Sequence, residues 1–408
     1  MSIRKLPGQT CTACGACVNA CAFGAVQLVP DAEGFCAPEL SDACVECGVC
    51  EQVCPQMREI PSIKWRKAAK GWLAVGMDGK LIQNSASGGA FATFADYVIE
   101  SQNGVAFGAY MDQDFDVRHG CARSSAELAP MLGSKYVQSD IGLSHRACKR
   151  FLEDGRFVLY SGTPCQIAGL KGYLGRDYDK LITVDIVCHG VSSPLAFRSY
   201  IRWLSDRAKM RVVSYRFRNR TKYDRSGYIS KTTFQDKRGR TKVLWRRAER
   251  DVYFKAYLDG ELFRRSCYAC SYAQEARVSD ITLGDCNSYS RYKDFHPYEA
   301  SSIVLLNSPA GEGFWDAVSC RFHRTPLDVP GEMRANGQLH KPPALPDGRD
   351  AMCNSFSKGA FEIYEKECRK HMTTVRRLRS WAQLHVPLKL RMKISGGIRR
   401  LKRKTNHG

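Results

Sequence analysis

Apolar residues in the middle of the chain follow a strand, helix and strand pattern. The run from Phe157 to Tyr160 is typical of a strand, and Pro164 suits the first turn of a helix that we expect to end near Leu174. A continuous apolar run at 181–187 then predicts a buried strand. This order indicates two parallel strands joined by a crossover helix. Their carboxyl ends meet at one edge of the sheet, where open α/β folds bind ligands.

The preceding segment has the same mixed character. The stretch "GWLAV" (71–75) predicts a strand, and "MDGK" (77–80) predicts a turn. The stretches 104–110 and 115–122 predict two further strands joined by a polar turn. A helix is expected between the strand at 71–75 and the strand at 104–110. Apolar residues recur there at helical spacing: Phe91, Phe94, Tyr97 and Val98.

A glycine- and serine-rich segment leads into that helix. It contains Asn84, Ser85, Ser87, Gly88 and Gly89. Free backbone N–H groups at the start of a helix favour a bound phosphate. A plain helix cap explains the same residues, so both interpretations stay open.

Cysteines at the N-terminal end give the strongest chemical signal. The stretch "CTACGACVNAC" is repeated in its spacing by "CVECGVCEQVC". In two-cluster ferredoxins three closely spaced cysteines bind one cluster, and the fourth binds the other cluster. The spacing therefore predicts two 4Fe–4S clusters, one held by Cys11, Cys14, Cys17 and Cys54, the other by Cys44, Cys47, Cys50 and Cys21. Structural zinc sites are the alternative, although zinc motifs usually separate two CxxC pairs by a longer span.

Four later cysteines form a second candidate set. Cys165 follows the first predicted strand of the central unit, and Cys188 follows the second, so both should reach the same sheet edge. Cys267 and Cys270 supply another CxxC pair. Four thiols suffice for a third cluster, but a zinc site, a redox disulfide or unrelated thiols remain alternatives. Cys165 could also be a nucleophile at a helix N-terminus, with His189 as a general acid.

Composition limits the class of protein. The 408 residues can form two or three domains, and no apolar run is long enough to span a membrane. We expect no signal peptide, because the first ten residues lack an apolar core. The 19 cysteines then indicate metal ligands in a reducing cytoplasm rather than a disulfide scaffold.

Basic residues are concentrated in two regions. The alternating basic and aromatic residues of 214–228 indicate a hairpin covering the active site rather than a nucleic-acid face, since no nucleic-acid motif accompanies them. Residues 368–408 contain 13 Lys and Arg and no Asp or Glu. This tail suits docking on an anionic membrane surface, which would make the protein peripheral at the inner face of the membrane. A disordered, solubilising tail is the equal alternative.

Several motifs together resemble one known family, the coenzyme F420 hydrogenase/dehydrogenase beta subunits and their bacterial relatives. The motifs occur in family order over roughly residues 8–310 and comprise "NSASGGAFA", "GSKYVQSD", "SGTPCQIAGLKGYL", "VDIVCHGVSSP", "CYAC", "SDITLGD" and "SSIVLLN". The resemblance implies a flavoprotein that binds FAD and passes electrons through iron–sulfur clusters. Family members include deazaflavin-reducing subunits and a plant reductase that takes electrons from ferredoxin.

The resemblance also implies roles for individual residues. Asn84, Ser85, Ser87, Gly88 and Gly89 would contact FAD, with Lys135, Tyr136 and Gln138 near the flavin. Cys165, Cys188, Cys267 and Cys270 would hold the cluster next to the flavin. Lys135, His189 and Asp285 are the candidate catalytic residues. Cys286 stands where the family often has an aromatic residue, so the wall beside Asp285 should differ in shape.

These features predict an α+β protein with three parts. Residues 1–60 form a two-cluster ferredoxin domain, 71–345 a mixed α/β domain with FAD and iron–sulfur, and 346–408 a helical or disordered basic extension. The predicted function is an oxidoreductase that passes electrons between a ferredoxin-like carrier and a small-molecule substrate, with no nucleic-acid partner. A non-catalytic electron-transfer subunit is the alternative, and a structural zinc protein is a third class.

Overall fold

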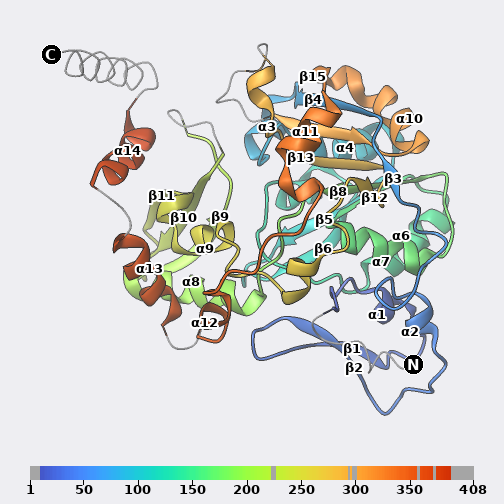
Figure 1. The fold of residues 1–408 in the computed structure, drawn as a ribbon, viewed down its shortest axis with the longest axis horizontal. Helices are drawn as coiled ribbons and strands as arrows, with labels where there is room; N and C mark the ends of the chain where they lie inside the picture. Colours follow the sequence, from blue (N-terminus) through green and yellow to red (C-terminus); the bar gives the residue numbers. More distant parts are fainter. Residues whose placement is uncertain are drawn as a thin grey trace.

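An eight-stranded sheet forms the centre of the computed structural model, which describes residues 10–221, 227–292, 295, 301–355, 359–370 and 374–386. Its strand order is β15-β4-β14-β13-β8-β7-β5-β6 (Figure 1). The neighbours β5, β7, β8 and β13 run parallel to one another. The strands are β4 (Lys70–Gly76), β5 (Val105–Met111), β6 (Val117–Ala122), β7 (Val158–Gly162), β8 (Leu181–Ile186), β13 (Ile281–Asp285), β14 (Ser302–Leu306) and β15 (Phe322–Pro326).

Helices cover both faces of this sheet. On one face, α4 (Ala90–Asp96) and α10 (Pro309–Val318) bury Phe94 and Trp315 against the strands. On the other face, α6 (Ser144–Glu153) and α7 (Pro164–Leu174) bury Leu152 and Ile167. Because both faces are buried, the central strands are apolar on both sides, which is typical of parallel sheets. The predicted strand, helix and strand unit is confirmed as β7, α7 and β8.

A small N-terminal domain packs beneath α6 and α7 (Figure 1). It contains α1 (Ala16–Ala20), the antiparallel pair β1 (Val26–Pro30) and β2 (Cys36–Leu40), and α2 (Val49–Gln52). Its two cysteine motifs adopt the same backbone conformation. Ala13 and Glu46, inside the CxxC pairs, have φ of 49° and 55°, and Gly15 and Gly48 have φ of 78° and 73°. This repetition is expected when two similar loops wrap two similar groups.

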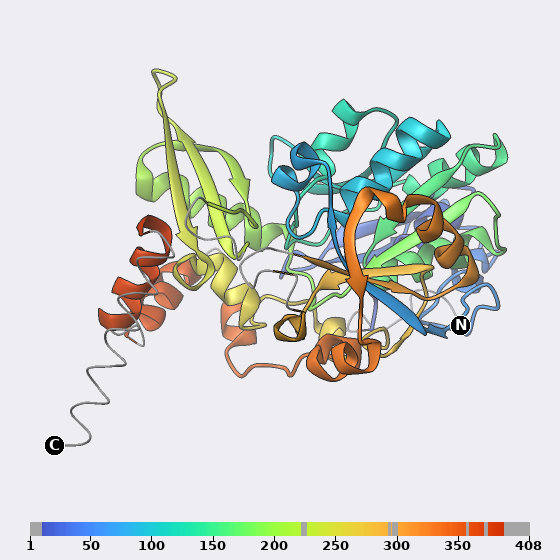
Figure 2. The same cartoon turned by 90° about the horizontal axis from the view of Figure 1, so that it is seen from above.

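A second body stands beside the main sheet (Figure 2). Its antiparallel sheet has the order β11-β10-β9, with β9 (Arg211–Arg216), β10 (Ile229–Gln235) and β11 (Thr241–Arg247). The helices packed with it are α8 (Pro194–Ala208), α9 (Val252–Leu258), α12 (Arg349–Cys353) and α13 (Ala360–Lys370). Met352 and Phe361 are buried in its core, so the segment after residue 346 begins as part of the fold.

The last described helix is α14 (Thr374–His385). Residues 387–408, which carry most of the predicted membrane-docking tail, lie outside the described residues. Within the described part of the chain, no helix is both long and apolar enough to cross a membrane.

Shorter elements connect these parts. The turn predicted at "MDGK" is wrong: Asp78 accepts hydrogen bonds from the backbone N–H groups of Lys80 and Leu81 and so caps a helix, α3 (Gly79–Asn84). The other connecting elements are β3 (Arg66–Lys67), η2 (Tyr97–Ser101), α5 (Ser125–Leu128), η3 (Ala129–Met131), η4 (Ala248–Arg250), η5 (Arg265–Ala269), β12 (Ala276–Arg277), η6 (Tyr289–Arg291), η7 (Ser319–Arg321), α11 (Val329–Ala335) and η8 (Gly337–Leu339).

Candidate iron–sulfur and flavin site

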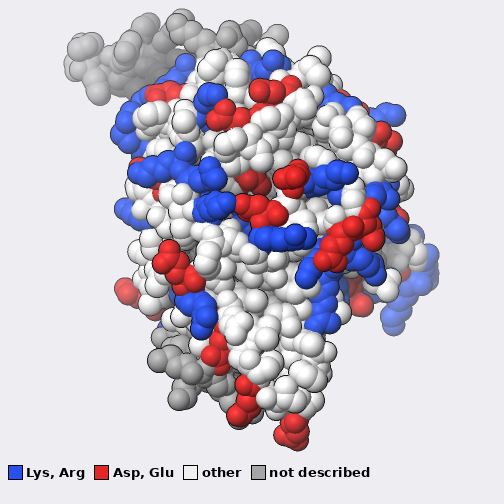
Figure 3. Space-filling model, turned by 90° about the vertical axis from the view of Figure 1, so that its right-hand side faces the viewer, with Lys and Arg blue, Asp and Glu red and all other residues white. Residues whose placement is uncertain are grey.

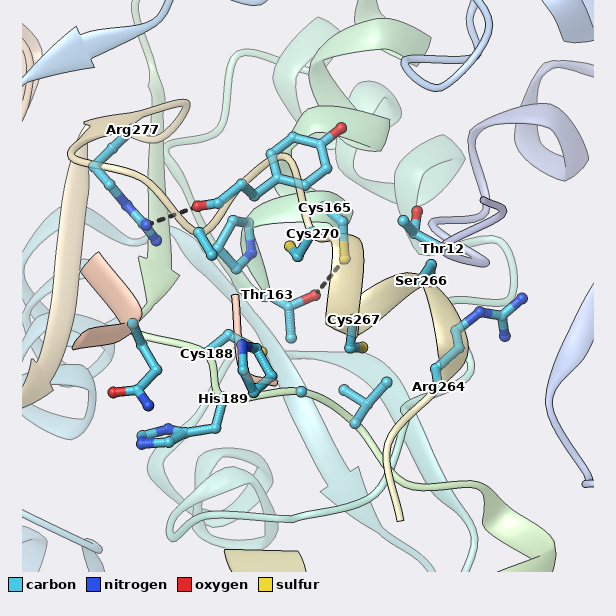
Figure 4. Close-up of a pocket in the computed structure, with 17 residues that line it drawn as sticks. Thr12, Thr163, Cys165, Cys188, His189, Arg264, Ser266, Cys267, Cys270 and Arg277 are labelled. Atoms are coloured by element: carbon cyan, nitrogen blue, oxygen red, sulfur yellow. Dashed lines mark hydrogen bonds between the residues drawn. The ribbon is translucent and has the colours of Figure 1, made fainter. Parts of the chain in front are cut away.

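Four cysteines line one cavity at the carboxyl edge of the central sheet (Figure 4). Cys165 begins α7 directly after β7, and Cys188 follows β8, as their sequence positions predict. Cys267 lies on η5 and Cys270 ends it. The cavity that they line is partly open to solvent.

The start of α7 is held firmly. The Gln166 side chain accepts a hydrogen bond from the backbone N–H of Thr163 at 2.9 Å, and Pro164 occupies the first turn. The Thr163 hydroxyl lies 3.2 Å from the sulfur of Cys165. Local sequence therefore fixes where this thiol points.

The four thiols interact electrostatically. Burial raises the pKa of Cys165 to about 11, and Cys270 adds to this shift. Burial also raises the pKa of Cys188 well above its ordinary value, with smaller contributions from Cys267, Cys165 and Cys270. Thiols that are costly to ionise alone lose their protons when a metal binds and takes up their charge. A free thiolate nucleophile at Cys165 is disfavoured by the same burial.

Four thiols that line one cavity are a possible donor set for a metal centre. Among the described residues, no group of three or more His, Cys, Asp or Glu side chains is close enough to hold a single metal ion. A tetrahedral zinc ion needs all its ligands on one atom. In a 4Fe–4S cluster the four cysteines share four irons, so their sulfurs stand further apart. Both kinds of centre can use four thiolates as ligands.

The N-terminal cysteines form the two predicted groups. Cys21 lines a cavity together with Cys44, Cys47 and Cys50. In the other group, burial raises the pKa of Cys14, and the neighbouring thiols Cys17, Cys54 and Cys11 add to this shift. The four thiols therefore lie close enough to affect one another. Backbone amides point at the sulfurs: the N–H of Ala25 donates to Cys21 at 3.3 Å, and the N–H of Ala13 donates to Cys11 at 3.3 Å.

Helix α7 links the N-terminal domain to the four-cysteine cavity. A Cβ added at Gly169 would lie 2.8 Å from the Cβ and sulfur of Cys14, and one added at Gly172 would lie 2.5 Å from the carbonyl oxygen of Val53. Cys165 and Gly169 are four residues apart and share a face of the helix, separated by a rise of about 6 Å. Cys14 thus contacts α7 about one turn from Cys165.

Two further residues connect the four-cysteine cavity to the N-terminal domain. Arg264 is only 4% exposed and lines the cavity, while donating to the carbonyl oxygens of Cys11 at 2.6 Å and Cys36 at 2.8 Å. Tyr272 also lines the cavity and accepts a hydrogen bond at 3.1 Å from Gln56, two residues beyond Cys54. Sequence reasoning missed both, because neither belongs to a recognisable motif.

Gln138 belongs to this interface. Its side-chain amide donates to the carbonyl oxygen of Thr12 at 3.0 Å, and its carbonyl accepts from Arg264 at 3.2 Å. The structure places this predicted flavin contact against the N-terminal domain.

Asp285 ends β13 at the same sheet edge. Its carboxylate accepts a hydrogen bond from Arg218 at 2.7 Å and from the Tyr228 hydroxyl at 3.3 Å. Burial opposes ionisation, but the charge of Arg218 lowers the pKa of Asp285. His189 lies on the rim of the four-cysteine cavity, close enough for Asp285 and Arg218 to affect its pKa. Cys286 turns away into a buried cluster with Glu332.

The glycine- and serine-rich segment packs tightly against the sheet. A Cβ at Gly88 would lie 2.3 Å from the carbonyl oxygen of Ala74 and 2.6 Å from the backbone nitrogen of Ser302, so only glycine fits. Gly89 has a φ of 80° and precedes α4. The hydroxyl groups of Ser87 and Ser85 donate to the carbonyl oxygens of Ser301 and Leu81, at 2.7 and 2.8 Å.

A groove beside this segment collects positive charge. Asn84, Lys135, Arg216 and Arg218 line it, around about 940 Å³ of space partly open to solvent. Arg216 donates to the carbonyl oxygen of Asn84 at 2.9 Å, and burial lowers the pKa of its guanidinium group. Tyr136 accepts a hydrogen bond at 3.4 Å from Arg218, one of the lining residues.

Lys135 should destabilise the protein at neutral pH when no anion is bound. Burial, with a smaller effect of Arg216, lowers its pKa from 10.5 to about 7, while its amine donates to the carbonyl oxygen of Met131 at 2.6 Å. Between these two pH values the unfolded chain binds more protons, so stability rises with pH. We expect Lys135→Met to raise the free energy of unfolding by about 2 kcal/mol at or below pH 7, a value reduced for partial burial.

The gain should shrink as the pH rises and vanish above the ordinary lysine pKa. Denaturant unfolding of the cofactor-free protein across this range measures it. Lys242→Met, on the exposed strand β11, is the matched control and should show a flat difference. A difference for Lys135→Met that does not change with pH would contradict the assignment.

Two family models match parts of the chain. Residues 155–323 match a family model for the C terminus of the coenzyme F420 hydrogenase/dehydrogenase beta subunit, and residues 10–59 match a model for a 4Fe-4S dicluster domain. No curated protein matches the chain. A similar solved chain comes from a xenon-derivatised structure of the F420-reducing NiFe hydrogenase complex from Methanosarcina barkeri. It is 17% identical, covers 78% of this chain and 96% of its own length, and has a TM-score of 0.44.

Proposed function

We propose that the chain is an iron–sulfur flavoprotein oxidoreductase related to the coenzyme F420 hydrogenase/dehydrogenase beta subunits, because residues 155–323 match the model of that subunit's C terminus. It would pass electrons between a one-electron carrier, either ferredoxin or another low-potential carrier, and a small-molecule substrate that exchanges two electrons. Two equivalents of carrier would then react for each substrate molecule. A 4Fe-4S dicluster domain at residues 10–59 is the entry or exit for single electrons.

One observation carries the proposal: the four-cysteine cavity lies between the dicluster domain and the Asp285 edge of the sheet. Cys14 contacts α7 about one turn from Cys165, and His189 stands between the cavity and Asp285. We assign one cluster to Cys11, Cys14, Cys17 and Cys54, a second to Cys21, Cys44, Cys47 and Cys50, and a third to Cys165, Cys188, Cys267 and Cys270. The three sites would form a continuous path to the sheet edge.

The groove next to that edge fits FAD by its charge. Lys135, Arg216 and Arg218 line it, and among the described residues Arg216 has no carboxylate within salt-bridge distance. A half-buried guanidinium group is suited to a phosphate, because its fork of N–H donors matches the phosphate oxygens. Arg216 would bind the diphosphate beside the Asn84–Gly89 segment, while Tyr136 would pack near the ring. When bound, FAD accepts electrons singly and exchanges them in pairs.

Acid–base chemistry would fall to three residues. Lys135, with its pKa lowered to about 7, can donate or accept a proton near neutral pH. Asp285, kept ionised by Arg218, would orient that guanidinium group. His189, on the cavity rim, would face the substrate. Docking of the basic tail on an anionic membrane surface is a separate part of the proposal.

Iron and flavin contents of the anaerobically purified chain test the proposal. Three clusters require about twelve irons, together with one FAD, per chain. Arg216→Gln should lower FAD retention and leave the iron content unchanged. About twelve irons without flavin, even after reconstitution with FAD, would contradict the proposed oxidoreductase function. This result would favour the alternative, a non-catalytic electron-transfer subunit.

A further inference from the structure

The two cluster sites of the dicluster domain differ in their access to solvent. Cys11, Cys14, Cys17 and Cys54 are 6 to 8% exposed. In the other group, Cys47 is exposed, Cys44 and Cys50 are half-buried, and Cys21 alone is buried. The first site therefore faces α7, and the second faces outward. Any protein that exchanges electrons with the domain must approach the second site.

Apolar side chains surround that outward site. Phe23 and Val45 are each 57% exposed, and Val49 is 37% exposed. All three line the same cavity as Cys44 and Cys47. Exposed apolar residues gathered around one functional point are typical of a contact surface. We call Phe23, Val45 and Val49, with the neighbouring Asp42 and Glu46, the Phe23 surface.

Charge on this domain is opposite to that of the whole chain. The chain carries a net charge of +21, yet residues 10–57 contain no Lys, Arg or His. The same stretch holds six acidic residues: Asp31, Glu33, Glu39, Asp42, Glu46 and Glu51. Glu33 pairs with Arg349 at 2.5 Å, so it is partly neutralised. The lower end of the molecule in Figure 3 accordingly shows acidic but no basic side chains.

We infer that the Phe23 surface docks a carrier protein whose redox centre is surrounded by lysine and arginine residues. This deepens the proposed function, because it names the kind of carrier used. A basic rim on the partner would face Asp42 and Glu46, and an apolar centre would cover Phe23 and Val45. An acidic ferredoxin would meet like charges and associate slowly. One electron passes in each encounter, and no bond forms or breaks.

Two probe proteins of similar size and opposite charge test this inference: a basic c-type cytochrome and an acidic ferredoxin. Binding of each labelled probe to the iron-loaded chain is measured at low and high salt. Transfer of one electron from the reduced chain to the oxidised cytochrome is followed in parallel. The cytochrome should bind faster at low salt and lose about tenfold in association rate when salt screens the charges.

Variants locate the surface. Glu46→Lys should lower the association rate of the cytochrome about tenfold at low salt and less than about twofold at high salt. Phe23→Ser should weaken binding at every salt concentration. Asp316→Lys, the same kind of change on an exposed position of α10 away from this domain, should have no effect. Unchanged iron content shows that the variants are folded and loaded.

Three outcomes would overturn the inference. The first is faster binding of the acidic ferredoxin, and the second is cytochrome binding that Glu46→Lys leaves unchanged. The third is self-association at low salt that Glu46→Lys abolishes, because the occupant would then be a second copy of this chain. A protein lacking flavin would sink the proposed function alone, since binding here needs only the dicluster domain.

Discussion

Cys165→Ser should reduce the iron content from about twelve to about eight atoms per chain and leave the dicluster domain loaded. The serine hydroxyl is a poor replacement for a thiolate ligand, and Cys165 lies in the cavity with the other three cysteines. Iron analysis and the paramagnetic resonance spectrum of the reduced protein measure the loss. Cys320→Ser, at an exposed cysteine on η7, is the matched control and should keep all the iron.

A second result would test the role of Cys165 as a nucleophile. If Cys165→Ser retained the full iron content but lost activity, the thiol would act on the substrate rather than on a metal. Cys188→Ser separates these cases, because it should lose the same four irons only if both thiols bind one cluster. The raised pKa of Cys165 favours the ligand role.

Gly172→Ala should weaken the docking of the dicluster domain against α7. In a helix interior this substitution normally stabilises by about 0.5–1 kcal/mol. Here the added Cβ would lie 2.5 Å from the carbonyl oxygen of Val53, which forces the backbone of the neighbouring domain to move. We expect a net loss of about 1–3 kcal/mol in the docking of that domain. Gly169→Ala should act in the same way through Cys14.

Limited proteolysis near residues 59–69 and hydrogen exchange in α1 measure this docking. Gly313→Ala in α10 is the control, because nothing lies within 4 Å of the added Cβ. It should be neutral or stabilising. If Gly172→Ala behaved like Gly313→Ala, the contact between α7 and the dicluster domain would not contribute to docking.

Local sequence was sufficient to predict the unit of β7, α7 and β8. Helix α7 has Pro164 in its first turn and ends before Gly175, which adopts the αL conformation. Apolar periodicity and turn residues predict these limits. The cysteine spacing likewise predicted which thiols gather in the dicluster domain. The limits of α7 depend on residues next to them in sequence, and the cysteine groups follow from a spacing that occurs twice within residues 11–54.

The rest depended on contacts between distant segments. Gly169 and Gly172 look like weak points of a helix, and only the packed N-terminal domain explains them. Arg264 contacts the carbonyl of Cys11, 253 positions away in sequence, and Arg218 reaches Asp285 across 67 positions. The periodicity of apolar residues contains no information about such distant pairs. The residues between the metal sites could therefore not be found from sequence alone.

The short pairing of β3 with β12 has a consequence for how the protein matures. All ligands of the dicluster domain precede residue 55, so that domain can acquire its iron while the ribosome is still making the remainder. The third site is complete only after Cys270 has emerged. β12 follows at once, and it pairs with β3, the strand that leads out of the dicluster domain. Filling of the proposed third site and fastening of the first domain would therefore be adjacent events, because β12 begins six residues after Cys270.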